Sequence, residues 1–322
     1  MKPFAHFVVL ISLCFGSDVA HAQTAKTKTV KKTFTYKTVG DLDIKLDLHR
    51  PDDDKIRPVA VSIHGGALMN GGRGGMGRTQ RELLKEGYCV VSIDYRLAPE
   101  TKLPEIIADV EDAFRWIHAN GRGKLKGDTS NLVVLGGSAG GHLTLSTGFL
   151  IKPRPAVLIA FWGYGDLVGP WYSEPSPHPR HQGKKMSAAE AAKIEAGPPI
   201  ANAADRKGDG GAYYQRCRQL GIWPNKVSEF DPKTEPEKFY PYMAVKNVDK
   251  NYPPTLMIHG TLDTDVPYEQ SVMMAAEFKK HGVPYKLISV QNGEHGLGGA
   301  DKNEIEAAYQ QVLPFIKKHR GD

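Results

Sequence analysis

The chain has 322 residues, of which 40% are hydrophobic and 24% are charged, and its formal net charge is +6. This is the composition of an ordinary globular protein that is long enough for one large core. The basic residues are scattered except for four lysines between positions 26 and 32, and no zinc finger or recognition helix accompanies them. We therefore expect no nucleic-acid partner.

The first residues have the pattern of a secretory signal. Lys2 precedes an apolar run at 4–15, and Ala20-His21-Ala22 supplies a small-residue cleavage motif. We predict a signal peptide over 1–22, cut before Gln23. The run is too short to span a bilayer. The mature chain, 23–322, should be periplasmic or secreted without a membrane anchor, and an uncleaved N-terminal anchor is the alternative.

Three cysteines are present, and Cys14 leaves with the predicted signal. Cys89 lies in an apolar run and is interpreted as a buried small hydrophobe, whereas Cys217 lies in a polar, helix-like segment. An oxidising compartment would permit a disulfide between these two residues. Their spacing does not imply one.

Along the mature chain, predicted strands alternate with predicted helices. Alternating residues at 34–39 and 42–49 flank Gly40-Asp41 and predict a hairpin. Apolar runs predict strands at 58–63, 88–93, 132–135, 156–161, 254–258 and 285–290. Helical patterns lie at 78–86, 103–119, 142–150, 268–280 and 303–318, the last with a kink or a new start at Pro314. This order predicts an α/β fold with a mostly parallel, twisted sheet, helices on both faces and an antiparallel edge.

One region interrupts the alternation. Residues 166–251 contain no convincing strand and are rich in Pro, Gly and charged residues. Ser187 and Glu190 form a capping box that opens an Ala-rich helix, and 211–220 predicts a second helix. The segment is too long for an ordinary loop. We interpret it as a helical lid or substrate-pocket insertion, with a decorative insertion as the alternative.

The stretch that carries the chemistry is Gly136-Gly137-Ser138-Ala139-Gly140, a G-x-S-x-G between a buried strand and a helix. In that context the pattern predicts a nucleophile elbow, with Ser138 at the tip of a strained turn. The flanking positions must lack side chains, and Gly136 and Gly140 satisfy this requirement.

A serine nucleophile needs a base and an acid, and both are expected just after strands. His295 follows the strand at 285–290 and is the predicted base. Two aspartates, Asp263 and Asp265, follow the strand at 254–258. We favour Asp263 as the acid because it is nearer to the strand end, and Asp265 could instead cap the next helix.

A tetrahedral intermediate also needs N–H donors for its oxyanion. Ala139 N–H, at the start of the elbow helix, is one predicted donor. The turn at 64–67, which follows a core strand, supplies the others, and Gly65 and Gly66 let its backbone approach a substrate.

Taken together, five segments resemble the α/β-hydrolase superfamily, and within it the hormone-sensitive-lipase and feruloyl-esterase-like carboxylesterases. They are His64-Gly65-Gly66, the stretch 94–100, Gly136 to Gly140, the stretch 259–263 and Glu294-His295-Gly296. The resemblance implies that Ser138, Asp263 and His295 form a catalytic triad, that Gly65, Gly66 and Ala139 bind the oxyanion, and that no metal or organic cofactor is required. It also implies a structural role for 94–100.

The chain departs from the family pattern at Ala67 and Leu68, where a third glycine and often an aromatic residue are usual. Because a Cβ restricts positive φ, this leaves open whether Gly66 or Ala67 donates to the oxyanion. The glycines between positions 71 and 77 suggest a mobile loop in the pocket wall.

The sequence therefore predicts an exported serine carboxylesterase acting on a small-molecule or carbohydrate ester, with acetylated or feruloylated carbohydrate suggested by family analogy alone. Two alternatives are a serine peptidase of the prolyl-oligopeptidase kind and a non-catalytic binding module on a hydrolase scaffold. Trp162, Tyr164, Trp171 and Tyr172 could line the pocket or pack the insertion onto the core. The sequence does not indicate the oligomeric state.

Overall fold

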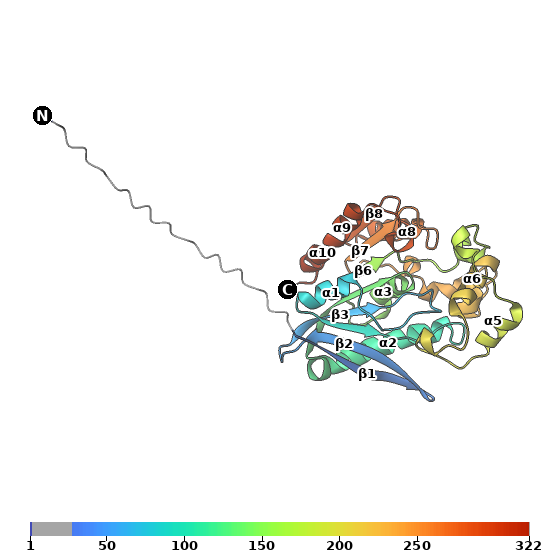
Figure 1. Cartoon of the computed structure of the whole chain (residues 1–322), viewed down its shortest axis with the longest axis horizontal. Helices are drawn as coiled ribbons and strands as arrows, with labels where there is room; N and C mark the ends of the chain where they lie inside the picture. Colours follow the sequence, from blue (N-terminus) through green and yellow to red (C-terminus); the bar gives the residue numbers. More distant parts are fainter. Residues whose placement is uncertain (2–27, 322) are drawn as a thin grey trace.

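The structure is a computed structural model that describes Met1 and residues 28–321 (Figure 1). Apart from Met1, the predicted signal peptide at 1–22 lies outside the described residues, as does Cys14. Within the described part of the chain, no helix combines the length and the apolar character needed to cross a membrane.

A sheet of eight strands forms the centre of the fold, in the order β1-β2-β4-β3-β5-β6-β7-β8. The strands are β1 (Thr29–Val39), β2 (Leu42–Pro51), β3 (Arg57–Ile63), β4 (Cys89–Ile93), β5 (Gly127–Gly137), β6 (Val157–Phe161), β7 (Thr255–Gly260) and β8 (Tyr285–Val290). β2 pairs antiparallel with β1 and β4, and every other pairing is parallel. The predicted mostly parallel sheet with an antiparallel hairpin at its edge is confirmed.

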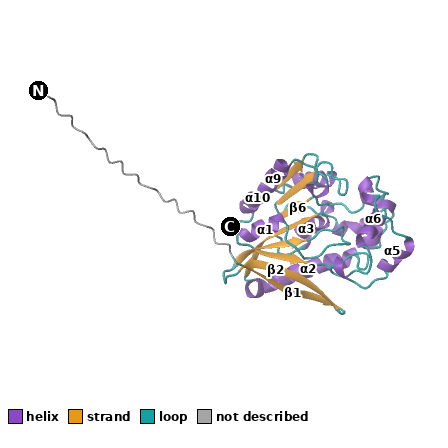
Figure 2. Cartoon of the chain, in the orientation of Figure 1, coloured by secondary structure: helices purple, strands orange, loops and turns teal. Residues whose placement is uncertain are grey.

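Helices cover both faces of the sheet (Figure 2). On one face, α2 (Leu103–Asn120), α3 (Ala139–Leu150) and α8 (Glu269–His281) share the larger apolar core. On the other, α1 (Arg78–Lys85), α9 (Lys302–Gln310) and α10 (Val312–His319) share the smaller one. Every residue of β4 and β6 is buried between these layers, which is why both strands read as unbroken apolar runs.

The structure differs from the predicted elements mainly at their ends. β5 begins at Gly127, before its apolar run, because Gly127 and Asp128 pair with Arg57 and Pro58 of β3. α3 begins at Ala139, directly after the elbow serine. The final helix is two helices, and Pro314 lies in the first turn of α10, where its missing N–H removes no helical hydrogen bond. The predicted new start is therefore correct.

Residues 166–251 are all described and contain no strand. Their α-helices are α4 (Pro170–Ser173), α5 (Ala188–Glu195), α6 (Gly210–Leu220) and α7 (Trp223–Ser228). The predicted capping box is present, because Ser187 Oγ accepts from Glu190 N. In Figure 1, α5 and α6 form a lobe at one side of the sheet. Trp223 of α7 is fully buried in the same core cluster as α2 and α3, so the insertion packs onto the core.

Cys89 in β4 and Cys217 in α6 are both buried free thiols. Burial raises the pKa of the Cys89 thiol to about 11 and that of the Cys217 thiol to about 12. Both cysteines therefore act as small apolar groups in the packing of their elements.

Candidate active site

The turn between β5 and α3 holds Ser138 in a strained conformation, with φ 58° and ψ −125°. A Cβ added at Gly136 would lie 2.3 Å from the carbonyl oxygen of Gly140, and one at Gly140 would lie 2.2 Å from that of Ile63. No side chain fits at either position. The predicted glycine requirement of the elbow thus has a direct steric cause.

The side chains of Ser138, His295 and Asp263 form a continuous row. His295 Nε2 lies 3.0 Å from Ser138 Oγ, and His295 Nδ1 lies 2.8 Å from Asp263 Oδ2. With the ring proton on Nδ1, Nε2 is left free to accept the hydroxyl proton of the serine. The structure therefore brings together three residues that are far apart in the sequence, each in a loop that follows a parallel strand.

Asp263 is held in place from both of its oxygens. Oδ1 accepts from the backbone N–H groups of Asp265 (2.9 Å) and Val266 (2.8 Å), and Oδ2 lies 3.3 Å from His259 Nε2. Burial raises the pKa of this carboxyl, but the hydrogen bonds with His259 and His295 outweigh that effect and lower the pKa to about 2. Asp263 is therefore ionised throughout the neutral range.

Asp265 does not cap the following helix, since α8 has no side-chain cap at its N-terminus. Its Oδ2 lies 3.7 Å from His295 Nε2, on the side of the ring that faces Ser138. Asp263 and Asp265 thus lie at opposite nitrogens of His295. Only Asp263 is placed to orient the imidazole through Nδ1.

The second arm of the site is the loop after β3. A Cβ at Gly65 would lie 2.7 Å from the carbonyl oxygen of Gly137, which shows how closely this loop packs on the elbow. Gly66 has φ +111°, but Ala67 and Leu68 also have positive φ, 58° and 61°. The Cβ of Ala67 thus does not prevent a left-handed turn here. Two consecutive strained residues need support from their surroundings.

That support comes from two directions. Tyr95 OH donates to the carbonyl oxygen of His64 at 2.9 Å, and the two rings stack at 4.2 Å. From the insertion, Trp223 Nε1 donates to the carbonyl oxygen of Ala67 at 3.0 Å. The stretch 94–100 therefore makes structural contacts beside the site, as its resemblance implied.

The insertion is also tied to that stretch. Arg206 and Glu100 form an ion pair of 2.6 Å in which both side chains are only 2% exposed. Arg206 also donates to the backbone carbonyl oxygen of Ala98. These contacts lie after β4, so the insertion covers the carboxyl ends of the strands, where the site is located.

A cavity of about 560 Å³ opens beside Ser138. Its lining combines aromatic side chains, polar side chains and the glycine-rich loop at 72–77; the aromatic residues are Phe161, Trp162 and Tyr309, and the polar ones are Ser62, Thr79, Gln80 and Ser92. Thr79 Oγ1 is buried and has no hydrogen-bond partner among the described residues. The cavity thus presents both apolar and polar side chains to a ligand.

The four aromatic residues after β6 have divided roles. Trp162 lines the cavity. Tyr164, Trp171 and Tyr172 instead pack against one another and reach Trp223, with Tyr172 and Trp223 stacked at 4.0 Å. Three of them therefore attach the insertion to the core, and one faces the site.

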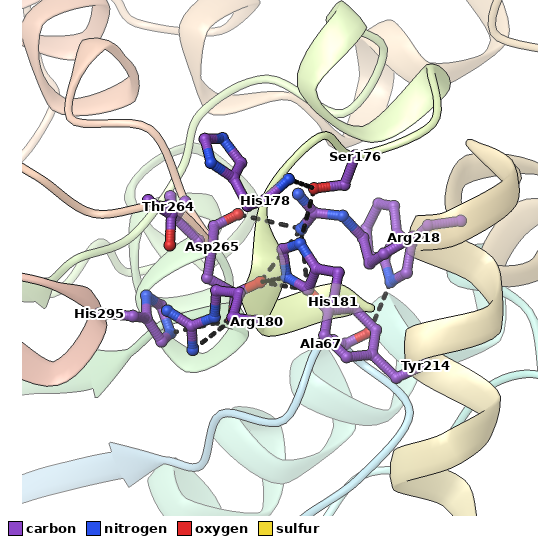
Figure 3. Close-up of polar contacts among 12 residues, drawn as sticks. Ala67, Ser176, His178, Arg180, His181, Tyr214, Arg218, Thr264, Asp265 and His295 are labelled. Carbon is purple, nitrogen blue, oxygen red and sulfur yellow. Dashed lines mark hydrogen bonds and ion pairs between the residues drawn. The ribbon is translucent and has the colours of Figure 1, made fainter. Parts of the chain in front are cut away.

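A polar cluster from the insertion converges on Asp265 (Figure 3). Asp265 Oδ1 accepts hydrogen bonds from His181 Nε2 (2.9 Å), Tyr214 OH (2.5 Å) and Arg218 Nη1 (3.1 Å). Sequence reasoning missed this cluster and also missed Trp223 and Arg206. Only the spacing of Asp263 and Asp265 hinted that a second carboxylate lies at the site.

Family models match two parts of the chain. The model described as BD-FAE matches residues 46–154, and that of the prolyl oligopeptidase family matches residues 213–322. The first range includes Gly65, Gly66 and Ser138, and the second includes Asp263 and His295.

Curated relatives of the chain include fungal polyketide synthases. The chain is 27% identical over 352 residues to the non-reducing polyketide synthase prhL of Penicillium brasilianum and 36% identical over 156 residues to Preu6 of Preussia isomera. These matches cover 90% and 44% of the chain, but only 14% and 7% of the relatives. The chain therefore corresponds to a small part of each synthase.

Solved structures share the fold. A Staphylococcus aureus protein of unknown function has a TM-score of 0.67 at 21% identity, covering 90% of this chain and 99% of that one. The propionate-bound Est2 esterase of Thermogutta terrifontis has a TM-score of 0.60 at 21% identity, covering 89% and 93%. With the family matches and the geometry above, the chain has the α/β-hydrolase fold and, within that superfamily, resembles the hormone-sensitive-lipase and feruloyl-esterase-like carboxylesterases.

Proposed function

We propose that the protein is an exported carboxylesterase in which Ser138 is the nucleophile, His295 the general base and acid, and Asp263 the residue that orients His295. One observation carries the proposal: the unbroken row from Ser138 Oγ through both ring nitrogens of His295 to Asp263 Oδ2, with distances of 3.0 and 2.8 Å. Such a row lets a neutral imidazole remove the serine proton while a fixed carboxylate stabilises the imidazolium that forms.

In the first half of the reaction, Ser138 Oγ attacks the ester carbonyl carbon while its proton passes to His295 Nε2. The negative charge that develops on the carbonyl oxygen is stabilised by Ala139 N–H, which has no helical partner in the first turn of α3, and by the Gly65-Gly66 turn. The C–O bond then breaks, and the leaving oxygen takes the proton from Nε2. In the second half, water attacks the acyl-serine, again giving its proton to Nε2, which returns it to Ser138 Oγ.

The substrate we propose is a small-molecule or carbohydrate ester. The cavity of about 560 Å³ beside Ser138 has the size of a small-molecule site, and both aromatic and polar side chains line it. The likeness to an esterase that binds propionate favours a short acyl group. Acetylated and feruloylated sugars are the first candidates to assay.

The test is hydrolysis of nitrophenyl esters with acyl chains of different length, compared between the native chain and Ser138→Ala. We expect loss of about 10⁴-fold or more in kcat, with an unchanged melting temperature. A fluorophosphonate probe should label the native protein at Ser138, as identified by mass spectrometry. Full ester hydrolysis by a folded Ser138→Ala protein would overturn the proposal.

A second candidate function is peptide hydrolysis, which the match of residues 213–322 to the prolyl oligopeptidase family favours. The same row of residues could attack an amide carbonyl. Peptide amides therefore belong in the assay panel, and cleavage of amides without cleavage of esters would replace the esterase by this candidate.

Export is part of the proposal and rests on the N-terminal sequence pattern. If it is correct, the protein purified from its native host begins at Gln23. N-terminal sequencing that finds Met1 instead would support the uncleaved anchor.

A further inference from the structure

Asp265 lies at the proton-transferring end of His295. Its Oδ2 is 3.7 Å from His295 Nε2, the nitrogen that is also 3.0 Å from Ser138 Oγ. Figure 3 shows the two side chains facing each other, with Arg180 beside them. The esterase mechanism proposed above requires no carboxylate at this position, so the position itself needs an explanation.

The carboxylate is held rigidly by the insertion. All three hydrogen-bonding groups on Oδ1, from His181, Tyr214 and Arg218, belong to the insertion, and His181 is in turn 2.7 Å from Ser176 Oγ. Burial raises the pKa of Asp265, but the His181 hydrogen bond and the positive neighbours outweigh it and lower the pKa well below its usual value. Asp265 is thus a fixed, ionised acceptor.

The second oxygen of this carboxylate is free to accept. Among residues 28–321, Oδ2 takes part in no hydrogen bond; its polar neighbours are His295 Nε2 at 3.7 Å and Arg180 Nη2 at 3.6 Å. The side chain of Asp265 is 12% exposed. A ligand atom that approaches His295 from the solvent therefore meets an unused lone pair on Oδ2.

The charges around Oδ2 cancel. Arg218 pairs with Asp265, and Arg180 pairs with Glu294 at 2.5 Å while lying near Asp265. Two guanidinium groups thus face these two carboxylates, while a third ionised carboxylate, that of Asp263, lies at the far nitrogen of His295. A balanced cluster does not attract a cationic substrate by net charge, but it still offers a strong hydrogen-bond acceptor to a neutral donor.

The chemistry of ester cleavage indicates which part of the substrate lies next to Asp265 Oδ2. The leaving oxygen must come within about 3 Å of His295 Nε2 to take its proton. Because Oδ2 is near the same nitrogen, it lies next to the leaving alcohol, whereas the cavity that Ser138 lines, and that neither His295 nor Asp265 lines, is available to the acyl group. A hydroxyl on the neighbouring carbon, one bond beyond the carbon that bears the leaving oxygen, is then within reach of Oδ2.

We propose that Asp265 is a specificity residue that accepts a hydrogen bond from a hydroxyl on the carbon next to the one that carries the scissile ester oxygen, so that the enzyme prefers monoesters of vicinal diols, such as those of sugars or glycerol. The inference rests on the proposed function and adds its leaving-group class. It involves no new covalent step: the proton still passes from Nε2 to the leaving oxygen as the C–O bond breaks.

The first test uses the native protein and four acetate esters. These are 2-hydroxyethyl acetate, 2-methoxyethyl acetate, 3-hydroxypropyl acetate and acetylcholine, each normalised to its alkaline hydrolysis rate. We expect kcat/KM for the 2-hydroxyethyl ester to exceed that for the methoxy ester by about tenfold, since a hydrogen bond to a charged acceptor is lost. The 3-hydroxypropyl ester, with its hydroxyl one carbon farther away, should lose most of the advantage.

The second test compares Asp265→Asn with the native protein. A carboxylate near His295 also stabilises the imidazolium, so the variant should be slower on every ester. The ratio between the hydroxyethyl and methoxyethyl esters isolates the proposed contact and should fall toward one. Asp249→Asn is the matched control, because Asp249 pairs with Arg154 on the surface before β7 and should leave the ratio unchanged.

The outcomes separate the two proposals. If the native protein hydrolyses all four esters without preferring the 2-hydroxyethyl ester, or prefers acetylcholine, the role of Asp265 is wrong and the esterase proposal stands. If it hydrolyses none and a fluorophosphonate probe does not label Ser138, the proposed function itself fails. The substrate comparison needs only the native protein, so the inference remains testable even if Asp265→Asn does not fold.

Discussion

The two halves of the site are built in different ways. Ser138, Asp263 and His295 lie in short loops that directly follow β5, β7 and β8, so the parallel strands themselves set their positions. The insertion instead reaches the site through long side chains, such as those of Tyr214 and Arg218, which meet at the single carboxylate of Asp265. Under the function proposed above, the first half carries out the reaction and the second half selects the substrate, because an insertion can change without disturbing the strands.

Substitutions of Asp263 and Asp265 should distinguish the two halves most clearly by their effects on steady-state kinetics. We expect Asp263→Asn to lower kcat by about 10⁴-fold, since an amide at Nδ1 favours the wrong tautomer of His295. Asp265→Asn should be moderately slower on every ester and should lose about tenfold more in kcat/KM on esters with a neighbouring hydroxyl. Steady-state kinetics on 2-hydroxyethyl and 2-methoxyethyl acetate measures both effects.

The melting temperatures of both variants serve as the folding control. A larger loss of kcat in Asp265→Asn than in Asp263→Asn would reverse the assignment and make Asp265 the acid of the triad. The separation between reaction and selection would then be wrong as well.

The sequence allowed the first half of the site to be predicted for a physical reason. Fully buried parallel strands are unbroken apolar runs, so their carboxyl ends can be located, and a serine, an aspartate or a histidine just beyond them is a strong signal. β6 and β7, in which every residue is buried, are clear examples. The polar beginning of β5 was missed because Gly127 and Asp128 extend the strand through backbone pairing with β3, which leaves no side-chain pattern.

The second half could not be predicted for a different reason. His181, Tyr214 and Arg218 converge on Asp265 from separate parts of an insertion that lacks strands. A polar contact between distant residues has no periodicity, and each residue by itself is ordinary for a solvated surface. The positive φ of Ala67 was likewise hidden, because it depends on contacts that Trp223 and Tyr95 make with the loop.

We expect kcat to depend mainly on the first half of the site and the free energy of unfolding to depend on the second half. Arg218 is only 2% exposed and donates to the side chain and to the backbone carbonyl of Asp265. Arg218→Met leaves that carboxylate without its buried partner, which we expect to lower the free energy of unfolding by about 3–5 kcal/mol. Urea denaturation measures the change.

Arg115→Met is the comparison, because Arg115 is 74% exposed and its ion pair with Asp112 should contribute less than about 1 kcal/mol. If Arg218→Met is no more destabilising than Arg115→Met, the cluster at Asp265 does not anchor the insertion.

We expect acid to weaken the packing of His142 against Tyr164, which joins α3 to the loop that leads into the insertion. His142 in α3 is fully buried, stacks on Tyr164 at 4.8 Å and lies with Nδ1 3.1 Å from the carbonyl oxygen of Tyr164. Burial lowers its pKa to about 4 from 6.5. The folded protein therefore binds fewer protons than the unfolded chain between these values. The stability that neutral His142 contributes is complete above pH 6.5 and falls by about 3 kcal/mol as the pH approaches 4.

Denaturation at several pH values, for the native protein and for His142→Gln, tests this. The difference in unfolding free energy between the two proteins should shrink as the pH falls from 6.5 to 4, since glutamine does not titrate. A difference that stays constant over this range would show that protonation of His142 does not weaken the junction.

The smallest change in the free energy of unfolding is expected in the loop after β3, which contains Ala67 and Leu68. Ala67 has a φ of 58°, a conformation that costs an L-residue about 1–2 kcal/mol. Glycine would remove this cost but would add about 0.4–1 kcal/mol of conformational freedom to the unfolded chain. Ala67→Gly should therefore raise the free energy of unfolding by about 0.5 kcal/mol.

Leu68→Gly relieves the same strain but deletes a fully buried side chain, so it should lower the free energy of unfolding by about 2 kcal/mol or more. Chemical denaturation of both variants measures these changes in the free energy of unfolding. If Ala67→Gly is also destabilising, the contacts from Trp223 and Tyr95 have already removed the strain at Ala67.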